Sequence, residues 1–511
     1  MISLSGESLS KVDRTDSLYL TLAAAHPRLA AKDATTWGPA AATEAAVRLN
    51  WVDLDETSRD LLPILDALAA KFRARTDLVL CGMGGSSLAP EVIAQTYDKK
   101  VFILDSTDPN YLAHALTGSP ADLLVIVSSK SGSTIETSSQ RAFFENYLTS
   151  AKLDPTSHML FVTDPGSPLD LDVRAKGFTV INADPKVGGR FSALTAFGLT
   201  PATLMGVDAS ILLDQAGDLR AQLLRDPATA LDVAYLLLTQ NEQFLGFTDQ
   251  GSKFPGLSDW IEQLIAESTG KEEKGRLPIA TENFVDANGG GAFSIAFAPG
   301  AQLSVIGELG EHFLFWEWVT ALMSAGLAID PFNQPNVTEA KEATSKVLQE
   351  WGNKLPALQA SATDDYVEIF GDGNTLTAAL KNLIATTDAD GYIAIMAYLD
   401  RRDDSAISEL RSILSKKSGR PVSFGWGPRF LHSTGQFHKG GQQNGSFLQI
   451  TGITKMDYSI PGREFGFTTL LMAQAVGDSK ALAARKYPLL RLHLQDRSAG
   501  ISQLLAAAKA L

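Results

Sequence analysis

The chain has a single cysteine, Cys81, among its 511 residues. An intrachain disulfide is therefore impossible, and this usage is typical of a reducing compartment. No apolar run approaches the about 20 residues that a helix needs to cross a bilayer. The first residues, MISLSGESLSKVDRTD, lack the basic start and the apolar stretch of a secretory signal. Together these absences favour a cytoplasmic globular protein.

Positive charge is also in deficit. The chain has 44 Lys and Arg against 58 Asp and Glu, a formal net charge of −14. Such a surface repels nucleic acid and anionic membranes, so we expect neither as a partner. An anionic small molecule would be repelled as well, and local hydrogen-bond donors would have to bind it.

Signatures of cofactors and metals are missing too. The segment 82–87, GMGGSS, lacks the third glycine of a dinucleotide-binding loop, and no P-loop lysine follows it. The seven histidines show no ligand spacing, and the lone cysteine lies in an expected strand. We therefore expect no metal and no cofactor.

What is present is an α/β pattern. Helical spacing of apolar residues in 18–31 and 61–73 predicts a helical N-terminal segment over 1–75. Short runs that are apolar throughout then alternate with helix-compatible segments, which predicts a parallel sheet buried on both faces. The expected strands of this sheet are 78–81, 101–104, 123–127, 159–162 and 178–181.

A second, looser α/β region follows from near residue 290. Its expected strands are 303–306, 366–370, 392–398, 422–426 and 447–450, with helices at 313–325 and 408–417. The segment 287–292, ANGGGA, is predicted to be a flexible connection or a ligand loop. The last residues, 466–511, are rich in alanine and leucine, and we predict a helical tail without chemistry.

Three polar loops follow strands of the first sheet, where ligands of parallel sheets bind. The first loop and the second loop, 129–134 (SKSGST), each precede a helix, whose N-terminal N–H groups attract anions. The third loop, 187–192 (VGGRFS), presents Arg190 from a glycine pair. The predicted phosphate and substrate ligands in the first two loops are Gly85, Ser86, Ser129, Lys130, Ser131 and Thr134.

Two later segments, 263–271 (QLIAESTGK) and 334–341 (QPNVTEAK), complete a recognisable series. Together with the three loops, and in the same order, they resemble the phosphoglucose isomerase family, which is built from sugar isomerase domains. The resemblance covers residues 77–341. It places the family's glutamine and catalytic glutamate at Gln263 and Glu267, and its second glutamine and its lysine at Gln334 and Lys341.

The histidine segment departs from the commoner bacterial pattern, in which an L-H-S-x-G-Q stretch lies between the glutamate and the lysine. Here His312 is the histidine of that interval, and its EHFLFWEW context does not match. A matching stretch, LHSTGQ, follows the lysine at 431–436 and contains His432. This order resembles the isomerase half of transaldolase–isomerase fusion chains without the transaldolase half. We predict His432 as the catalytic histidine and His312 as a packing residue.

The resemblance implies a fold of two doubly wound parallel-sheet sugar isomerase domains with helical N- and C-terminal segments. We place them at 76–245 and 246–465, between the segments 1–75 and 466–511. It also implies a homodimer, in which the partner subunit is one possible source of the histidine.

The implied reaction is the interconversion of glucose 6-phosphate and fructose 6-phosphate through an enediolate. Glu267 would carry the proton between C1 and C2, since desolvation brings a carboxylate pKa toward neutral pH. His432 would open the sugar ring, and Arg190 and Lys341 would stabilise negative charge. The alternatives are a broader isomerase that also accepts mannose 6-phosphate, or a non-catalytic phosphosugar sensor.

Overall fold

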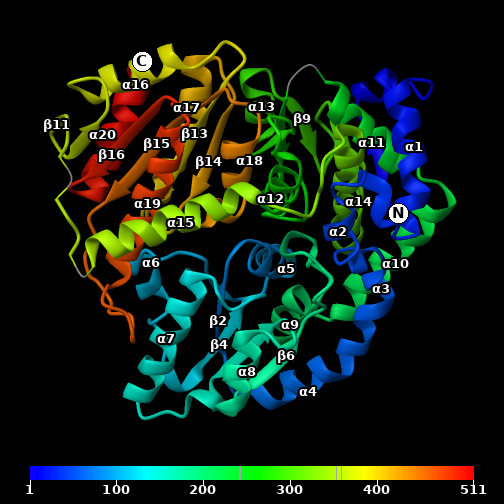
Figure 1. The fold of residues 1–511 in the computed structure, drawn as a ribbon, viewed down its shortest axis with the longest axis horizontal. Coiled ribbons are helices and arrows are strands. Elements are labelled where there is room, and N and C mark those ends of the chain that lie inside the picture. The colour runs from blue at the N-terminus through cyan, green and yellow to red at the C-terminus, as the bar shows by residue number, and fades with distance from the viewer. Residues whose placement is uncertain (241–242, 353, 358) are drawn as a thin grey trace.

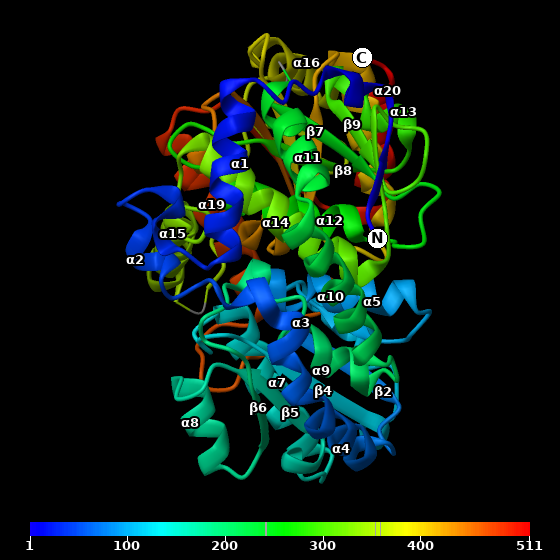
Figure 2. The ribbon, with the colours of Figure 1, turned by 90° about the vertical axis from the view of Figure 1, so that its right-hand side faces the viewer.

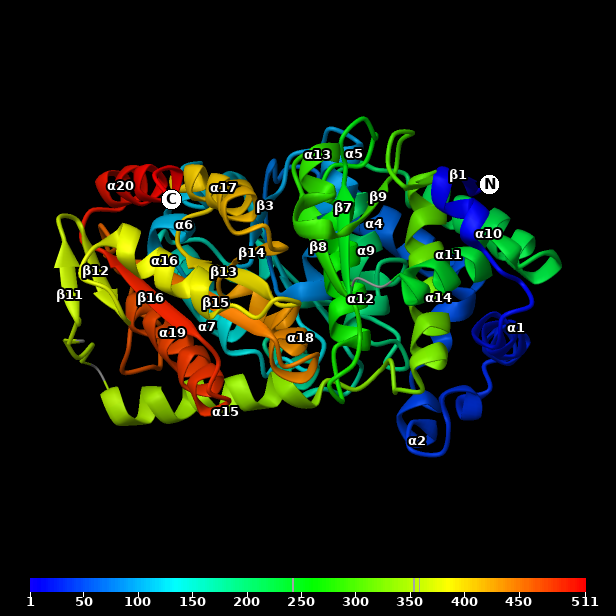
Figure 3. The same ribbon diagram turned by 90° about the horizontal axis from the view of Figure 1, so that it is seen from above.

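Three β-sheets, each parallel in its central part, organise the chain (Figure 1). The computed structural model describes residues 1–240, 243–352, 354–357 and 359–511. We number the sheets by the chain order of their central strands. The unit built on the first sheet lies below the other two in Figure 1, and Figure 3 shows the second and third sheets side by side.

The first sheet is fully parallel, with the strand order β3-β2-β4-β5-β6. Neighbouring residues of its central strands pack into different cores, Leu80 on one face and Cys81 on the other. This is the doubly wound order in which the carboxyl ends of β2 and β4 form a ligand crevice. The strands are β2 (Asp77–Gly82), β3 (Phe102–Leu104), β4 (Leu123–Ser128), β5 (Met159–Thr163) and β6 (Thr179–Asn182).

Helices cover both faces of the first sheet. Side chains of α6, α7 and α8 pack on one face, and those of α4, α5 and α9 pack on the other. Their bounds are α4 (Leu62–Phe72), α5 (Leu88–Thr96), α6 (Pro109–His114), α7 (Ile135–Ser150), α8 (Pro168–Ala175) and α9 (Ala196–Leu204).

The second sheet has the order β1-β10-β9-β7-β8, in which only β1 is antiparallel to its neighbour. Its strands are β1 (Ser3–Ser5), β7 (Phe244–Thr248), β8 (Leu277–Thr281), β9 (Phe293–Ala296) and β10 (Leu303–Ile306). The helices of this region are α1 (Ser17–Ala30), α2 (Ala42–Ala45), α3 (Leu54–Thr57), α10 (Ala209–Arg225), α11 (Ala228–Thr239), α12 (Leu257–Thr269), α13 (Phe284–Ala287) and α14 (Leu309–Leu327).

The third sheet has the order β11-β12-β16-β15-β13-β14, and β12 runs antiparallel to both of its neighbours, β11 and β16. Its strands are β11 (Ala362–Asp364), β12 (Val367–Phe370), β13 (Tyr392–Tyr398), β14 (Val422–Trp426), β15 (Gly445–Gly452) and β16 (Leu489–Leu494). Its helices are α15 (Pro335–Trp351), α16 (Leu376–Thr386), α17 (Glu409–Ser418), α18 (Gly435–Gly440), α19 (Phe467–Ala484) and α20 (Arg497–Lys509).

The predicted α/β class with parallel-dominated sheets is confirmed, and all ten predicted strands overlap strands of the structure. The region predicted as one second domain, 246–465, instead carries strands of two sheets. The strands β7, β8 and β9 were not predicted, and Gly246 and Pro278 weaken the strand signal of the first two. Proline is tolerated in β8 because that strand lies at the sheet edge.

The C-terminal segment 466–511 holds the two helices α19 and α20 and, between them, the strand β16. The prediction of a helical tail was therefore incomplete. The strand β16 alternates buried and half-buried residues, and this period of two is a weak signal within a segment rich in alanine and leucine. The segment 287–292 forms a short helical turn, with Gly290 and Gly291 at positive φ. Within the described residues, no helix combines the length and apolar character needed to cross a membrane.

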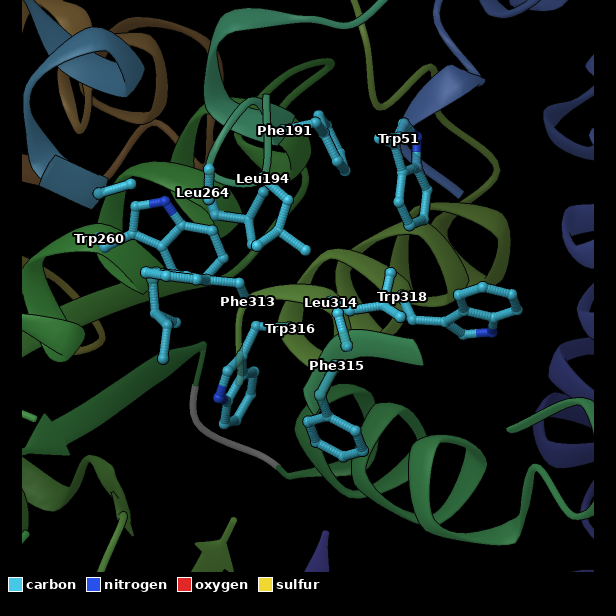
Figure 4. Close-up of a cluster of buried hydrophobic side chains, with 14 of the residues drawn as sticks. Trp51, Phe191, Leu194, Trp260, Leu264, Phe313, Leu314, Phe315, Trp316 and Trp318 are labelled. Atoms are coloured by element: carbon cyan, nitrogen blue, oxygen red, sulfur yellow. The ribbon is translucent and has the colours of Figure 1, made fainter. Parts of the chain in front are cut away.

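An aromatic cluster joins the first and second units (Figure 4). The ring centroids of Trp51 and Phe191 lie 5.1 Å apart, and those of Trp51 and Trp318 lie 6.0 Å apart. Phe191 is fully buried, and burial of such a side chain contributes about 1.5–3 kcal/mol. Because Phe191 follows Arg190, this cluster fixes the third loop at the junction of the two units, which Figure 2 shows from the side.

Candidate active site

A cavity of about 160 Å3 lies at the carboxyl ends of β2 and β4. We call it the main cavity. All the predicted site residues except Lys341 line it. The fold therefore brings these predicted residues together from three separate loops, from α12 and from the segments that carry Gln334 and His432.

The first loop contacts the third directly. A Cβ atom on Gly85 would lie 1.9 Å from the carbonyl oxygen of Gly189, so no larger residue fits without a backbone shift. Gly84 has a φ of +56°, which also favours glycine. The glycines thus serve close packing of two loops around the cavity, and Ser86, 9% exposed, lines it beside them.

The second loop ends at the N-terminus of α7. Ser129 Oγ accepts a hydrogen bond from the Gly132 N–H at 3.1 Å, and the hydroxyls of Ser131 and Ser133 lie 2.7 Å apart. Thr134 occupies the N-cap position, and its side chain caps no N–H group of the described helix. The first N–H groups of α7 therefore remain available to an anion, and the helix dipole favours one there.

Lys130 is the predicted ligand that the structure engages elsewhere. Its Nζ lies 2.7 Å from Asp164 Oδ2 and donates to the carbonyl of Pro185 at 3.2 Å. Burial lowers the pKa of Lys130, although the Asp164 carboxylate opposes this shift. The residue lines the cavity, but its ammonium group braces the loop against its neighbours.

Arg190 is 4% exposed and is held on several sides. Its Nε donates to Ser268 Oγ at 2.8 Å, and its Nη1 donates to Gln334 Oε1 at 3.0 Å. Its Nη2 donates to the carbonyls of Pro331 and Asn333. Burial lowers the pKa of Arg190, and the carboxylate of Glu267, 3.4 Å from Nη1, opposes that shift.

Glu267 lies on α12 and is 8% exposed. Its Oε2 accepts a hydrogen bond from Gln263 Nε2 at 3.1 Å, and the same Gln263 nitrogen donates to the carbonyl of His432 at 2.8 Å. One turn of α12 therefore holds the carboxylate and the backbone of the histidine segment together. Lys271, from the same motif, instead donates to Asp330 and Asn333 and so fixes the segment that leads to Gln334.

His432 of this chain lines the main cavity together with Glu267. Its late place in the sequence is compatible with the predicted site, because the third unit carries it back to the first. Its Nε2 donates to Glu136 Oε1 at 2.9 Å. No partner subunit is needed to bring a histidine to this cavity. His312, in contrast, is fully buried between Phe254 and Phe297, as a packing residue would be.

Glu136 is a functional candidate that the sequence analysis missed. It lies in the first turn of α7, where the helix dipole favours any acidic residue, so the sequence gives no further signal. It is 3% exposed; burial would raise the pKa of its carboxyl group, but His432, a backbone hydrogen bond and Lys341 together lower it. The carboxylate also accepts a hydrogen bond from Gln474 Nε2 at 2.7 Å.

Lys341 lines a neighbouring cavity of about 110 Å3. This side cavity shares Thr134 and His432 with the main cavity, and Glu136 also lines it. Lys341 lies on α15, is exposed, and contributes to the lowered pKa of Glu136. The structure therefore places Lys341 beside the histidine rather than in the main cavity.

Within the part of the chain that the structure describes, no group of three potential metal ligands lies in either cavity. Among the described residues, the group that comes nearest to a ligand set is His114, Asp400 and Asp403. There His114 Nε2 lies 2.9 Å from Asp400 Oδ2, and the pair connects α6 with the turn after β13. None of the three lines the main or the side cavity.

No family model matches the chain. Over 238 residues, 45% of this chain, it is 30% identical to a probable glucose-6-phosphate isomerase of Haloquadratum walsbyi and covers 55% of that protein. It is 32% identical to a glucose-6-phosphate isomerase of Thermus thermophilus over 241 residues, 45% of this chain and 58% of the relative. The chain thus spans about half the length of the curated relatives that it matches.

A solved structure supports the fold. The glucose-6-phosphate isomerase of Chlamydia trachomatis aligns with 68% of this chain and 88% of its own, with a TM-score of 0.55 and 17% identity. At that identity the likeness concerns the fold alone. The chain is therefore similar to glucose-6-phosphate isomerases, in sequence over less than half of its length and in fold over two thirds of it.

Proposed function

We propose that this chain is an aldose–ketose isomerase that interconverts glucose 6-phosphate and fructose 6-phosphate. The observation that carries the proposal is the main cavity, in which a carboxylate, a guanidinium and a histidine face two loops rich in glycine and hydroxyl groups. The relatives named above support the phosphosugar class of the substrate.

Phosphate would bind at the second loop. The N–H groups at the start of α7 and the hydroxyls of Ser131 and Thr134 would donate hydrogen bonds to the phosphate dianion there. A chain with a net charge of −14 repels an anionic substrate, and these hydrogen-bond donors counteract that repulsion locally.

Ring opening would fall to His432. Glu136 accepts from Nε2, so the proton on that nitrogen is fixed and Nδ1 is left to exchange a proton with the sugar. The carboxylate also stabilises the imidazolium that forms on protonation. Lys341, beside this pair in the side cavity, adds positive charge near the ring.

Proton transfer between C1 and C2 would fall to Glu267. Gln263 orients its carboxylate from one side, and Arg190 lies on the other. The guanidinium is held before any substrate binds, so it can stabilise the enediolate without reorganisation. Such a reaction is redox-neutral within the sugar and needs no redox cofactor.

A coupled assay tests the proposal. Purified protein is given fructose 6-phosphate, and glucose 6-phosphate dehydrogenase reports product as NADPH, while calorimetry measures sugar phosphate binding. We expect turnover that Glu267→Gln lowers by about 10²–10⁴-fold and sugar phosphate binding that it retains. Binding without turnover in the wild type would contradict an enzyme and indicate a sensor. Turnover of mannose 6-phosphate in the same assay would broaden the substrate range.

A further inference from the structure

Gln474 reaches the acid–base pair from a segment that showed no chemistry in the sequence. It lies on α19, is 1% exposed, and donates from Nε2 to Glu136 Oε1 at 2.7 Å. That oxygen is the one that accepts from His432 Nε2. One carboxylate oxygen thus lies between an amide from the third unit and the imidazole.

The oxygen of the Gln474 amide contacts Thr107, which is fully buried just after β3, while the Glu136 carboxylate, an acceptor only, fixes which way the amide points. Thr107 Oγ1 donates to Gln474 Oε1 at 2.6 Å. If the amide were turned over, its oxygen would lie 2.7 Å from the Glu136 carboxylate, and two acceptors would repel each other. The amide therefore presents its N–H to Glu136.

We propose that Gln474, held by Thr107, is a positioning residue that orients the Glu136 carboxylate and so selects the Nε2–H tautomer of His432. A carboxylate free to turn would release that imidazole nitrogen, and the tautomer that leaves Nδ1 available would no longer be favoured. The effect on turnover rests on the proposed function, whereas the effect on the tautomer does not.

Electrostatics support the same role. Donation to a carboxylate stabilises its charged form, so loss of the Gln474 N–H makes Glu136 more basic. The groups facing Glu136 are His432 from the turn after β14, Lys341 from α15 and Tyr398 at the end of β13. Burial raises the pKa of Tyr398 well above its usual range, so it stays neutral. The proton on the Glu136–His432 pair is therefore sensitive to the amide.

The simplest competing explanation is that Gln474 only fills space in α19. Gln449 provides a matched control, because it is fully buried in β15 and donates to the α19 carbonyl of Ala475 at 2.8 Å. It lines neither cavity. A packing role predicts that Gln474→Met and Gln449→Met behave alike.

The first readout needs no activity. Long-range 1H–15N spectra of the imidazoles, with His432 assigned through His432→Gln, report which ring nitrogen carries the proton. We expect the Nε2–H tautomer in the wild type and in Gln449→Met, and a mixture in Gln474→Met. Thr107→Val should give a partial change in the same direction, and Thr107→Ser should restore the wild-type spectrum. An unchanged tautomer in folded Gln474→Met overturns the inference.

The second readout is the pH profile of turnover. In Gln474→Met we expect kcat to fall about 10-fold, KM to change less than about twofold, and the acid limb to move up by about 0.5–1 pH unit. Gln474→Glu adds a negative charge and should move the limb further in the same direction. A fall in kcat with a stationary limb in both variants would overturn the catalytic part. A changed tautomer in a wild type without turnover would refute the proposed function and leave the positioning role standing.

Discussion

Two glutamates five residues apart on α12, Glu262 and Glu267, face different cavities. They are almost equally buried, 7% and 8% exposed. Glu267 faces the main cavity, with Arg190 at 3.4 Å and Gln263 at 3.1 Å. Glu262 lines a further cavity of about 230 Å3 at the carboxyl ends of β8 and β14, distinct from the main and side cavities, which we call the second cavity. Its carboxyl group accepts a hydrogen bond from the Ala280 N–H at 3.2 Å.

The difference lies in charge rather than in burial. Burial, with a smaller contribution from Asp259, raises the pKa of Glu262 to about 8, so this carboxyl group is largely protonated at neutral pH. Glu267 has a guanidinium within reach, and it lines the main cavity together with the first and second loops. A buried carboxylate on a helix is therefore no sign of catalysis by itself, and the groups opposite decide its role.

We expect the largest effect on kcat from substitution of Glu267, with Glu262 as its control. Glu267→Gln should lower kcat by about 10²–10⁴-fold and leave sugar phosphate binding largely intact, because general base catalysis contributes about that much. Glu262→Gln should leave kcat within about twofold. The coupled assay measures both variants. Equal losses would remove the distinction between the cavities, and near-normal turnover in Glu267→Gln would remove Glu267 as the base.

Two neighbouring residues extend the comparison of the two cavities from α12 to the histidine segment. His432 lines the main cavity and Ser433 lines the second one. We expect His432→Gln to lower kcat by about 10–10²-fold, less than Glu267→Gln because sugar rings also open unaided in water. Ser433→Ala, the control, should change kcat less than about twofold. If the serine variant is as slow as the histidine variant, the loop matters only as a structural element.

Phosphate contacts should have a smaller effect, and on a different constant. Ser131→Ala and Thr134→Val should each raise KM by about 3–10-fold with kcat nearly unchanged, because these contacts exist in the ground state and in the transition state alike. Ser502→Ala, on α20 and outside every cavity described above, serves as the control. Unchanged KM in both loop variants would place the phosphate elsewhere, and the second cavity would be the next candidate.

How much the sequence could predict depended on chain distance. Gly85 and Ser131 come three residues after strands, and Arg190 lies in the loop that follows β6, so the rule that ligands bind at the carboxyl ends of parallel strands predicted them. His432 arrives from the third unit and was found only through its resemblance to a known segment. Glu136 and Gln474 lay beyond prediction, since their roles depend on hydrogen bonds between residues 296 and 338 positions apart.

The number of β-sheets could not be predicted from the sequence for a related reason. A strand such as β7 has only five residues, and a short apolar run does not distinguish a strand from a buried helical segment. The 392–398 run was easier, since seven consecutive buried residues give a strong signal. The division of strands between sheets depends on pairing between distant segments, which no local pattern carries.

The smallest effect expected concerns stability. Because the pKa of Glu262 is raised from 4.5 to about 8 in the folded chain, its contribution to stability is full below pH 4.5 and is lost as pH rises through 8. Glu262→Gln removes that dependence, since glutamine cannot ionise. Chemical denaturation at pH 5.5 and pH 8.5 should show the wild type losing more stability than the variant, by on the order of 2 kcal/mol. Glu267→Gln, measured in parallel, tests whether the two glutamates differ here as well. If the wild type and Glu262→Gln lose equal stability, Glu262 ionises freely, and the contrast in charge between the two cavities is wrong.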